Sequence, residues 1–86
     1  MDSVRERVSR VLAKQFQVPD ERVTEAATLD KDLGATSLDL VEVVMSLEDE
    51  FSIDISDDES SRLSTVGDVL ACVAAGVRRG GSARTL

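Results

Sequence analysis

Gly34-Ala-Thr-Ser37-Leu-Asp-Leu-Val-Glu-Val-Val-Met45-Ser-Leu-Glu-Asp-Glu-Phe51 is the stretch of this chain that decides its fold. Its apolar residues recur at helical spacing and predict a helix over residues 37–51 with one face toward a core. That face consists of Leu40, Val43, Val44, Leu47 and Phe51. At about 100° per residue, Leu38, Val41 and Met45 fall together on a second face. A small soluble protein needs a single apolar face on such a helix, so the second face predicts a docking strip unless a loop or short helix covers it.

Composition limits the classes of function. The chain has 86 residues, which suits one domain with a small core. Its formal charge of −7 is uneven: residues 20–60 hold 14 acidic and 2 basic residues, whereas the remainder holds 3 acidic and 8 basic residues. Nucleic-acid binding rests on Lys and Arg, so we expect no nucleic acid partner. An acidic surface instead favours partner enzymes with basic docking patches.

Nothing in the sequence predicts export or membrane insertion. The chain has no run approaching about 20 apolar residues, and its N-terminus lacks the basic and then apolar pattern of a signal peptide. The single cysteine excludes an internal disulfide. We therefore expect a cytoplasmic monomer that does not insert into membranes.

The remaining segments predict a helical architecture. Residues 3–16 suit a first helix, 17–35 a long loop, 57–62 a short helix and 66–79 a last helix. Pairs of a hydroxyl residue and a carboxylate three positions on mark the helix starts, at Ser3/Glu6, Thr36/Asp39, Ser56/Glu59 and Thr65/Asp68. The prediction is an all-α fold, a small four-helix bundle of three longer helices and one short helix, with a long loop between helices one and two. It forms one domain over residues 1–79, followed by a flexible C-terminal tail over residues 80–86.

Two helix faces complete this prediction. The last helix should turn one apolar face to the core, formed by Val66, Val69, Leu70, Val73 and Val77. The first helix should turn its basic residues to solvent, namely Arg5, Arg7, Arg10 and Lys14.

Ser37 is the candidate functional residue, although the chain lacks what a catalytic serine needs. A nucleophilic serine requires a base, and the sequence contains no histidine and no Gly-x-Ser-x-Gly elbow. We therefore expect no enzyme. The acidic clusters also fail as calcium loops, because Ala35 and Glu59 stand where such a loop needs glycine. Cys72 has no second ligand and suits packing as a small apolar residue. Ser37 can still be a site of modification at a helix start, where anions are stabilised, or simply a helix cap.

The run Leu33-Gly34-Ala35-Thr36-Ser37-Leu38, followed by the acidic helix, closely resembles the acyl carrier proteins. The resemblance implies that Ser37 is esterified with 4′-phosphopantetheine, taken from coenzyme A by a phosphopantetheinyl transferase. The arm would hold acyl groups as thioesters and present them to acyl-transferring, ketosynthase or other biosynthetic enzymes. The partner-binding residues it implies are Leu38, Asp39, Val41, Glu42, Met45 and Glu48.

The sequence leaves three alternatives open. Thr36 stands where carriers of fatty acid synthesis usually have Asp, so a fatty acid carrier and a specialised polyketide, lipid or natural-product carrier both fit. The family also sequesters acyl chains between helices, and Val44, Leu47, Phe51 and Val69 could line such a space or form ordinary core. The rival class is a small acidic adaptor that binds partners and is never modified.

Overall fold

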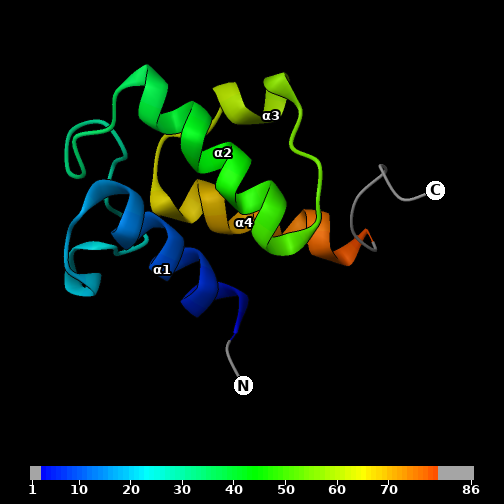
Figure 1. Ribbon diagram of the computed structural model, residues 1–86, viewed down its shortest axis with the longest axis horizontal. Coiled ribbons are helices and arrows are strands. Elements are labelled where there is room, and N and C mark those ends of the chain that lie inside the picture. The colour runs from blue at the N-terminus through cyan, green and yellow to red at the C-terminus, as the bar shows by residue number, and fades with distance from the viewer. Residues whose placement is uncertain (1–2, 80–86) are drawn as a thin grey trace.

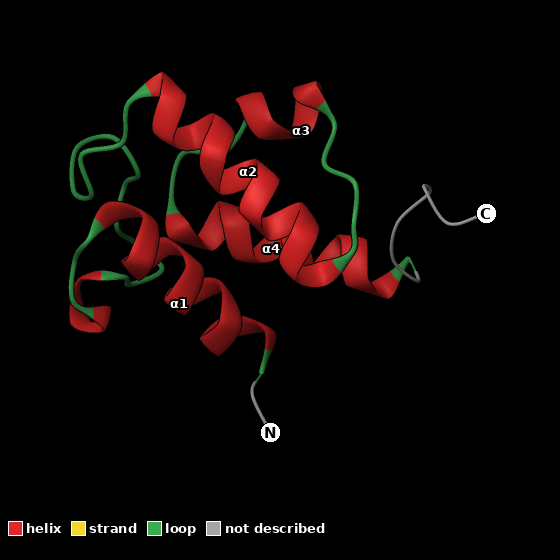
Figure 2. Cartoon of the chain, in the orientation of Figure 1, coloured by secondary structure: helices red, strands yellow, loops and turns green. Residues whose placement is uncertain are grey.

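The computed structural model describes residues 3–79 and shows a succession of helices joined by loops (Figures 1 and 2). In chain order these are α1 (Val4–Phe16), the 3-10 turn η1 (Asp20–Arg22), α2 (Ser37–Phe51), α3 (Asp57–Ser61) and α4 (Val66–Arg78). The predicted all-α fold with three longer helices and one short helix is confirmed. The predicted tail over residues 80–86 lies outside the described residues.

Capping boxes begin the four α-helices of the described chain. In each, a hydroxyl side chain accepts from a backbone N–H three residues on, and the side chain at that third position accepts from the cap's own N–H. The pairs are Ser3/Glu6, Thr36/Asp39, Ser56/Glu59 and Thr65/Asp68. The four predicted helix starts are confirmed. They could be predicted because both partners of each capping box lie within three residues of each other in the sequence.

The three longer helices enclose the core. α1 and α2 lie side by side with α4 behind them, and α3 lies on the opposite side of α2 from α1 (Figure 1). Their fully buried side chains are those of Val8, Leu12, Val43, Leu47, Val66, Val69 and Val73. α3 contributes no buried residue. It is therefore attached to the bundle mainly through the segments that flank it.

The long loop between α1 and α2 has more structure than predicted. Besides η1 it forms an isolated antiparallel bridge between Thr28 and Thr65. Leu29 N–H donates to the Ser64 carbonyl at 2.9 Å, and Val66 N–H donates to the Ala27 carbonyl at 3.0 Å. These bonds fix the loop to the start of α4, a pairing between distant segments that no periodicity in the loop could indicate.

The prediction that the basic residues of α1 form a solvated face was wrong for Arg7. Its Nε atom lies 3.0 Å from Glu50 Oε2, and a terminal nitrogen donates to the Glu50 carbonyl at 2.8 Å. The guanidinium also lies 4.5 Å from the centre of the Phe51 ring. Arg5 likewise pairs with Glu25. A helical wheel of α1 shows only the residues of that helix, whereas these long side chains extend to residues of α2 and of the long loop.

The predicted apolar face of α4 ends one turn early. Val66, Val69 and Val73 are buried, but Val77 is 40% exposed. At this level Gly76 closes the core, because a Cβ built there would meet three Ile53 carbon atoms at 3.1–3.2 Å. In this last turn of α4 the core contact is therefore made by Gly76, which packs against Ile53, and not by Val77. None of the described helices has the length and apolar character needed to cross a bilayer.

Candidate functional site

The loop that leads into α2 holds Ser37 in a defined place. Leu33 is buried, and Ala35 N–H donates to the Leu29 carbonyl at 2.8 Å. Between them Gly34 takes a φ of +75°, which L-residues with a side chain adopt only at a cost. The chain therefore turns sharply at Gly34 and delivers the following residues to the surface.

The N-terminus of α2 leaves the Ser37 hydroxyl available. Thr36 is the cap, since its Oγ1 accepts from Asp39 N–H at 3.2 Å and Asp39 Oδ2 accepts from Thr36 N–H at 3.0 Å. Ser37 is the first residue of the helix and is exposed, and its side chain makes no hydrogen bond to the part of the chain that the structure describes. The alternative that Ser37 is itself the cap is therefore wrong.

The second apolar face of α2 is uncovered. Leu38 is 66% exposed, Val41 56% and Met45 59%. The prediction that these three residues share an outward face is confirmed, and neither the long loop nor α3 covers them. We call this row the α2 ridge. It is an exposed apolar row beside Ser37, of the kind that marks interaction sites.

The carboxylates predicted to flank the ridge have different surroundings. Asp39 is half-buried and committed to the Thr36 cap. Glu42 is exposed on the α1 side, where its Oε1 accepts from Gln15 Nε2 at 2.8 Å. Glu48 is half-buried on the α3 side, where its Oε2 accepts from Ile55 N–H at 2.9 Å. Glu42 is therefore the most open of the three predicted carboxylates.

A groove of about 470 Å³ separates α2 from α3 and begins at Ser37. Its apolar wall consists of Leu40, Val41, Val44, Met45 and Ile55, and its polar wall of Ser37, Glu48, Asp57 and Ser60. Of the residues predicted to line a space for acyl chains, Val44 alone lies here. Leu47 and Val69 are fully buried in the core, and the Phe51 ring lies against the Arg7 guanidinium, so the burial of these residues agrees with the alternative of ordinary core.

The groove could not be predicted from the sequence, because the side opposite α2 is formed by α3 and depends on the position of that helix in the fold. Asp57 and Ser60 belong to a helix of five residues without an apolar stripe. Ile55 precedes that helix and reaches the groove from the connecting segment. The sequence marks these residues only as a cap and a short helix, and nothing in it indicates that they face Ser37.

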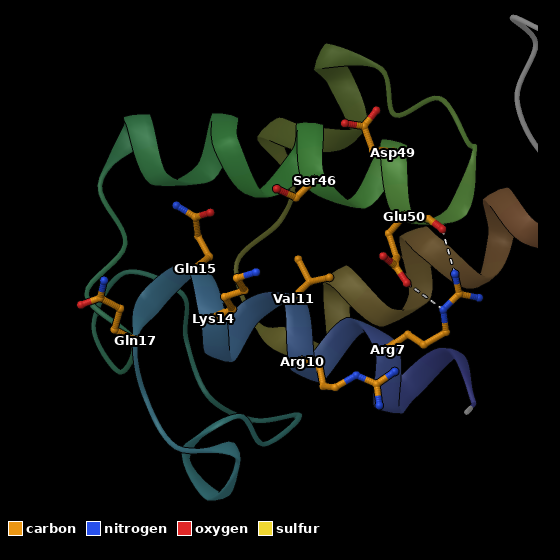
Figure 3. A pocket seen from close by; sticks show the side chains of 9 residues that line it. All are labelled: Arg7, Arg10, Val11, Lys14, Gln15, Gln17, Ser46, Asp49 and Glu50. Carbon is orange, nitrogen blue, oxygen red and sulfur yellow. Dashed lines mark hydrogen bonds and ion pairs between the residues drawn. The ribbon is translucent and has the colours of Figure 1, made fainter. Parts of the chain in front are cut away.

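A second groove of about 800 Å³ runs between α1 and α2 on the other side of the ridge (Figure 3). Its lining from α1 consists of Arg7, Arg10, Val11, Lys14 and Gln15, with Gln17 just beyond the helix, and α2 contributes Ser46, Asp49 and Glu50. The ion pair between Arg7 and Glu50 closes one end (Figure 3). The α2 ridge thus stands between an acidic groove that contains Ser37 and a groove of mixed charge.

The other polar candidates have structural roles. Asp32 accepts from Thr28 N–H at 2.8 Å and from the Thr28 hydroxyl, and these bonds hold the pKa of its carboxyl below the usual value. Burial raises the pKa of the Cys72 thiol, with a smaller contribution from Glu59. At neutral pH Cys72 is therefore a weakly reactive thiol packed against the core.

Two comparisons with known proteins agree with this geometry. A sequence model of the family described as "Phosphopantetheine attachment site" matches residues 6–73. Among solved structures, a protein assigned as an acyl carrier protein of Mycobacterium tuberculosis is 34% identical to this chain. The match covers 85% of this chain and 97% of that one, with a TM-score of 0.80.

These matches extend over most of the chain and agree with each other in kind. Proteins of this family hold a phosphopantetheine group and are carriers without catalytic activity of their own. They work with a phosphopantetheinyl transferase and with biosynthetic enzymes. The sequence pattern around Ser37, the helical fold and both comparisons lead to one conclusion: the chain belongs to the acyl carrier protein family.

Proposed function

We propose that this protein carries acyl groups on a 4′-phosphopantetheine arm attached to Ser37. The observation that supports this most is the Ser37 hydroxyl, exposed at the first residue of α2 while Thr36 takes the capping role. The partners would be a phosphopantetheinyl transferase and enzymes of fatty acid, polyketide or related biosynthesis. Residues 1–79 form the carrier domain in this proposal.

The surroundings of Ser37 suit a phosphodiester. In the transfer, Ser37 Oγ would lose its proton and bond to the phosphorus of coenzyme A that bears pantetheine, while the nucleotide bisphosphate leaves. The new anion would sit at the start of a helix of 15 residues, where the dipole and free N–H groups favour negative charge. The attached arm supplies a terminal thiol that holds an acyl group as a thioester.

The surface beside Ser37 suits docking by a basic partner. The α2 ridge would enter an apolar pocket and Glu42 would face a basic rim, whereas the carboxylates of Asp39 and Glu48 are already engaged by backbone N–H groups. Glu42 should contribute most to encounter, because it is exposed and, within the described residues, its carboxylate is bonded to the Gln15 side chain alone. The fit between this surface and the pocket and basic rim of each enzyme, and not the phosphopantetheine arm, would then decide which enzymes dock.

Intact-mass measurement tests the attachment site. The purified protein is incubated with coenzyme A and a phosphopantetheinyl transferase of broad specificity. We expect a gain of one phosphopantetheinyl group in the wild type and in Ser46→Ala, and no gain in Ser37→Ala. Ser46 is a matched control, since it lies on the same helix and faces the groove toward α1.

Two results would overturn the proposal. A gain that persists in Ser37→Ala would place the attachment elsewhere. An unchanged wild-type mass would favour the rival function, an unmodified adaptor, for which the exposed α2 ridge is the supporting observation.

A further inference from the structure

Glu48 organises the connection between α2 and α3 through two different atoms. Its backbone carbonyl accepts from Ile53 N–H at 3.2 Å. Its side-chain Oε2 accepts from Ile55 N–H at 2.9 Å, in a partly buried setting. One residue of α2 therefore fixes the chain at both ends of the segment Ile53–Ile55, which leads directly into α3.

α3 has few other attachments. It spans five residues and none of them is buried. The ion pair between Glu59 and Arg79 is long, at 3.9 Å, and its Arg79 side chain is 56% exposed, so it contributes little. Ile55, by contrast, is buried and lies two residues before the helix. The position of α3 therefore depends strongly on how firmly Ile55 is held.

The same contact borders the groove that begins at Ser37. Glu48 and Ile55 both line this groove, and Asp57 and Ser60 of α3 form its far side. If the Ile55 segment moves away from α2, the far side of the groove moves with it. A partly buried N–H that loses a charged acceptor also pays the cost of an unsatisfied donor, which makes such movement the expected response.

We propose that Glu48 is a positioning residue: its carboxylate holds the Ile55 amide and thereby fixes the α3 wall of the groove beside Ser37. This role differs from the docking role predicted for Glu48 from its place near the ridge. It requires a hydrogen-bond acceptor of the right shape and does not require a negative charge. Docking by electrostatic attraction requires the charge itself, so the two roles respond differently to Glu48→Gln, whose amide oxygen can still accept.

Amide hydrogen exchange measured by NMR tests the contact in the unmodified protein. In Glu48→Ala we expect the Ile55 amide to exchange about tenfold faster than in the wild type, the effect of losing one charge-assisted bond. In Glu48→Gln the neutral bond should retain about half of the protection in free-energy terms, which corresponds to about threefold faster exchange. Glu42→Ala is the matched control and should leave Ile55 unchanged.

The amides of Val43 and Leu47 distinguish a local effect from general unfolding. They lie in the core part of α2, and their exchange should stay within about twofold of the wild type in both Glu48 variants. Equal acceleration of Val43, Leu47 and Ile55 would overturn the proposal, because Glu48 would then act on the whole fold. Unchanged Ile55 exchange in Glu48→Ala would overturn it as well.

Kinetics with the phosphopantetheinyl transferase give a second readout, which rests on the proposed function. We expect Glu48→Gln to keep kcat/KM within about twofold of the wild-type value. In Glu48→Ala we expect kcat/KM to fall several-fold below the value for Glu48→Gln. Equal losses in both variants would show that the charge matters and would overturn the positioning role. If the wild type accepts no phosphopantetheine, the proposed function fails, whereas the exchange measurement still decides how Glu48 acts.

Discussion

Thr36 offers a test that separates helix capping from charge at the residue before Ser37. Two substitutions are needed. Thr36→Ala removes Oγ1, which accepts from Asp39 N–H, but leaves the bond from the backbone N–H of residue 36 to Asp39 Oδ2. Thr36→Asp supplies a new acceptor for the same N–H and adds the negative charge that carriers of fatty acid synthesis usually have there. The first variant changes the cap, and the second keeps the cap and changes the charge.

The expected changes in stability follow from this geometry. Loss of a Thr cap costs about 1 kcal/mol, and half of the capping box remains in Thr36→Ala, so we expect a loss of about 0.5–1 kcal/mol in the free energy of unfolding. In a domain of this size that lowers Tm by about 2–8 °C. For Thr36→Asp, a gain of about 0.3–1 kcal/mol from the helix dipole is opposed by repulsion from Asp39, and we expect stability close to wild type.

Urea unfolding followed by circular dichroism measures the first effect, and transferase kinetics measure the second. Thr36→Asp should raise kcat/KM toward a transferase with a basic docking patch, and the gain should shrink as ionic strength rises. Wild-type stability in Thr36→Ala would refute the capping argument. A lower kcat/KM for Thr36→Asp at low salt would show that Thr36 serves specificity in some way other than by reduced charge.

Two further predictions concern single acidic side chains, one on the surface beside the α2 ridge and one at the start of α4. Glu42→Lys should lower kcat/KM with the transferase several-fold at low salt and less at high salt, with only a small loss of stability, because Glu42 is exposed and its bond from Gln15 joins two surface side chains. Glu21→Lys makes the same charge change on η1, and equal losses in both variants would contradict docking at the ridge. Hydrogen bonds from the Thr65 and Ser64 amides hold the pKa of Asp68 below its usual value. The stability it contributes is present above about pH 4 and is lost as the pH falls through that lowered pKa. In Asp68→Asn, urea midpoints should be lower near neutral pH and should fall less on acidification, and parallel pH profiles would contradict this.

Features that depend on near neighbours in the chain were predictable from the sequence. The four capping boxes each involve residues three apart, so the pattern of hydroxyl and carboxylate contains the whole interaction. The two apolar faces of α2 follow from helical periodicity in the same way, down to the exposure of Leu38, Val41 and Met45.

Features that depend on how distant segments meet were not predictable. Arg7 leaves its expected solvated face because Glu50 and Phe51 of α2 lie within its reach. Val77 is exposed, whereas Gly76 is the residue packed against Ile53, which lies two residues beyond the end of α2. The groove beside Ser37 likewise depends on the placement of α3, which carries no apolar stripe of its own. In each case the deciding partner is remote in sequence, and a local pattern cannot specify it.

Different residues of α2 form the core, the N-terminal cap and the exposed ridge, so the choice of partner enzyme can change without a change in the core or the cap. The core uses Val43 and Leu47, the cap uses Thr36, and the α2 ridge belongs to neither. Exposed side chains away from caps and core usually alter stability by no more than about 0.5 kcal/mol when replaced, so ridge residues can vary with partner enzymes at little cost to folding. Asp39 and Glu48 are the exceptions, because their carboxylates hold backbone N–H groups of the cap and of the α3 connection. Variation in partner specificity should therefore concentrate on the ridge and on Glu42, while these two carboxylates are constrained by the structure that presents Ser37.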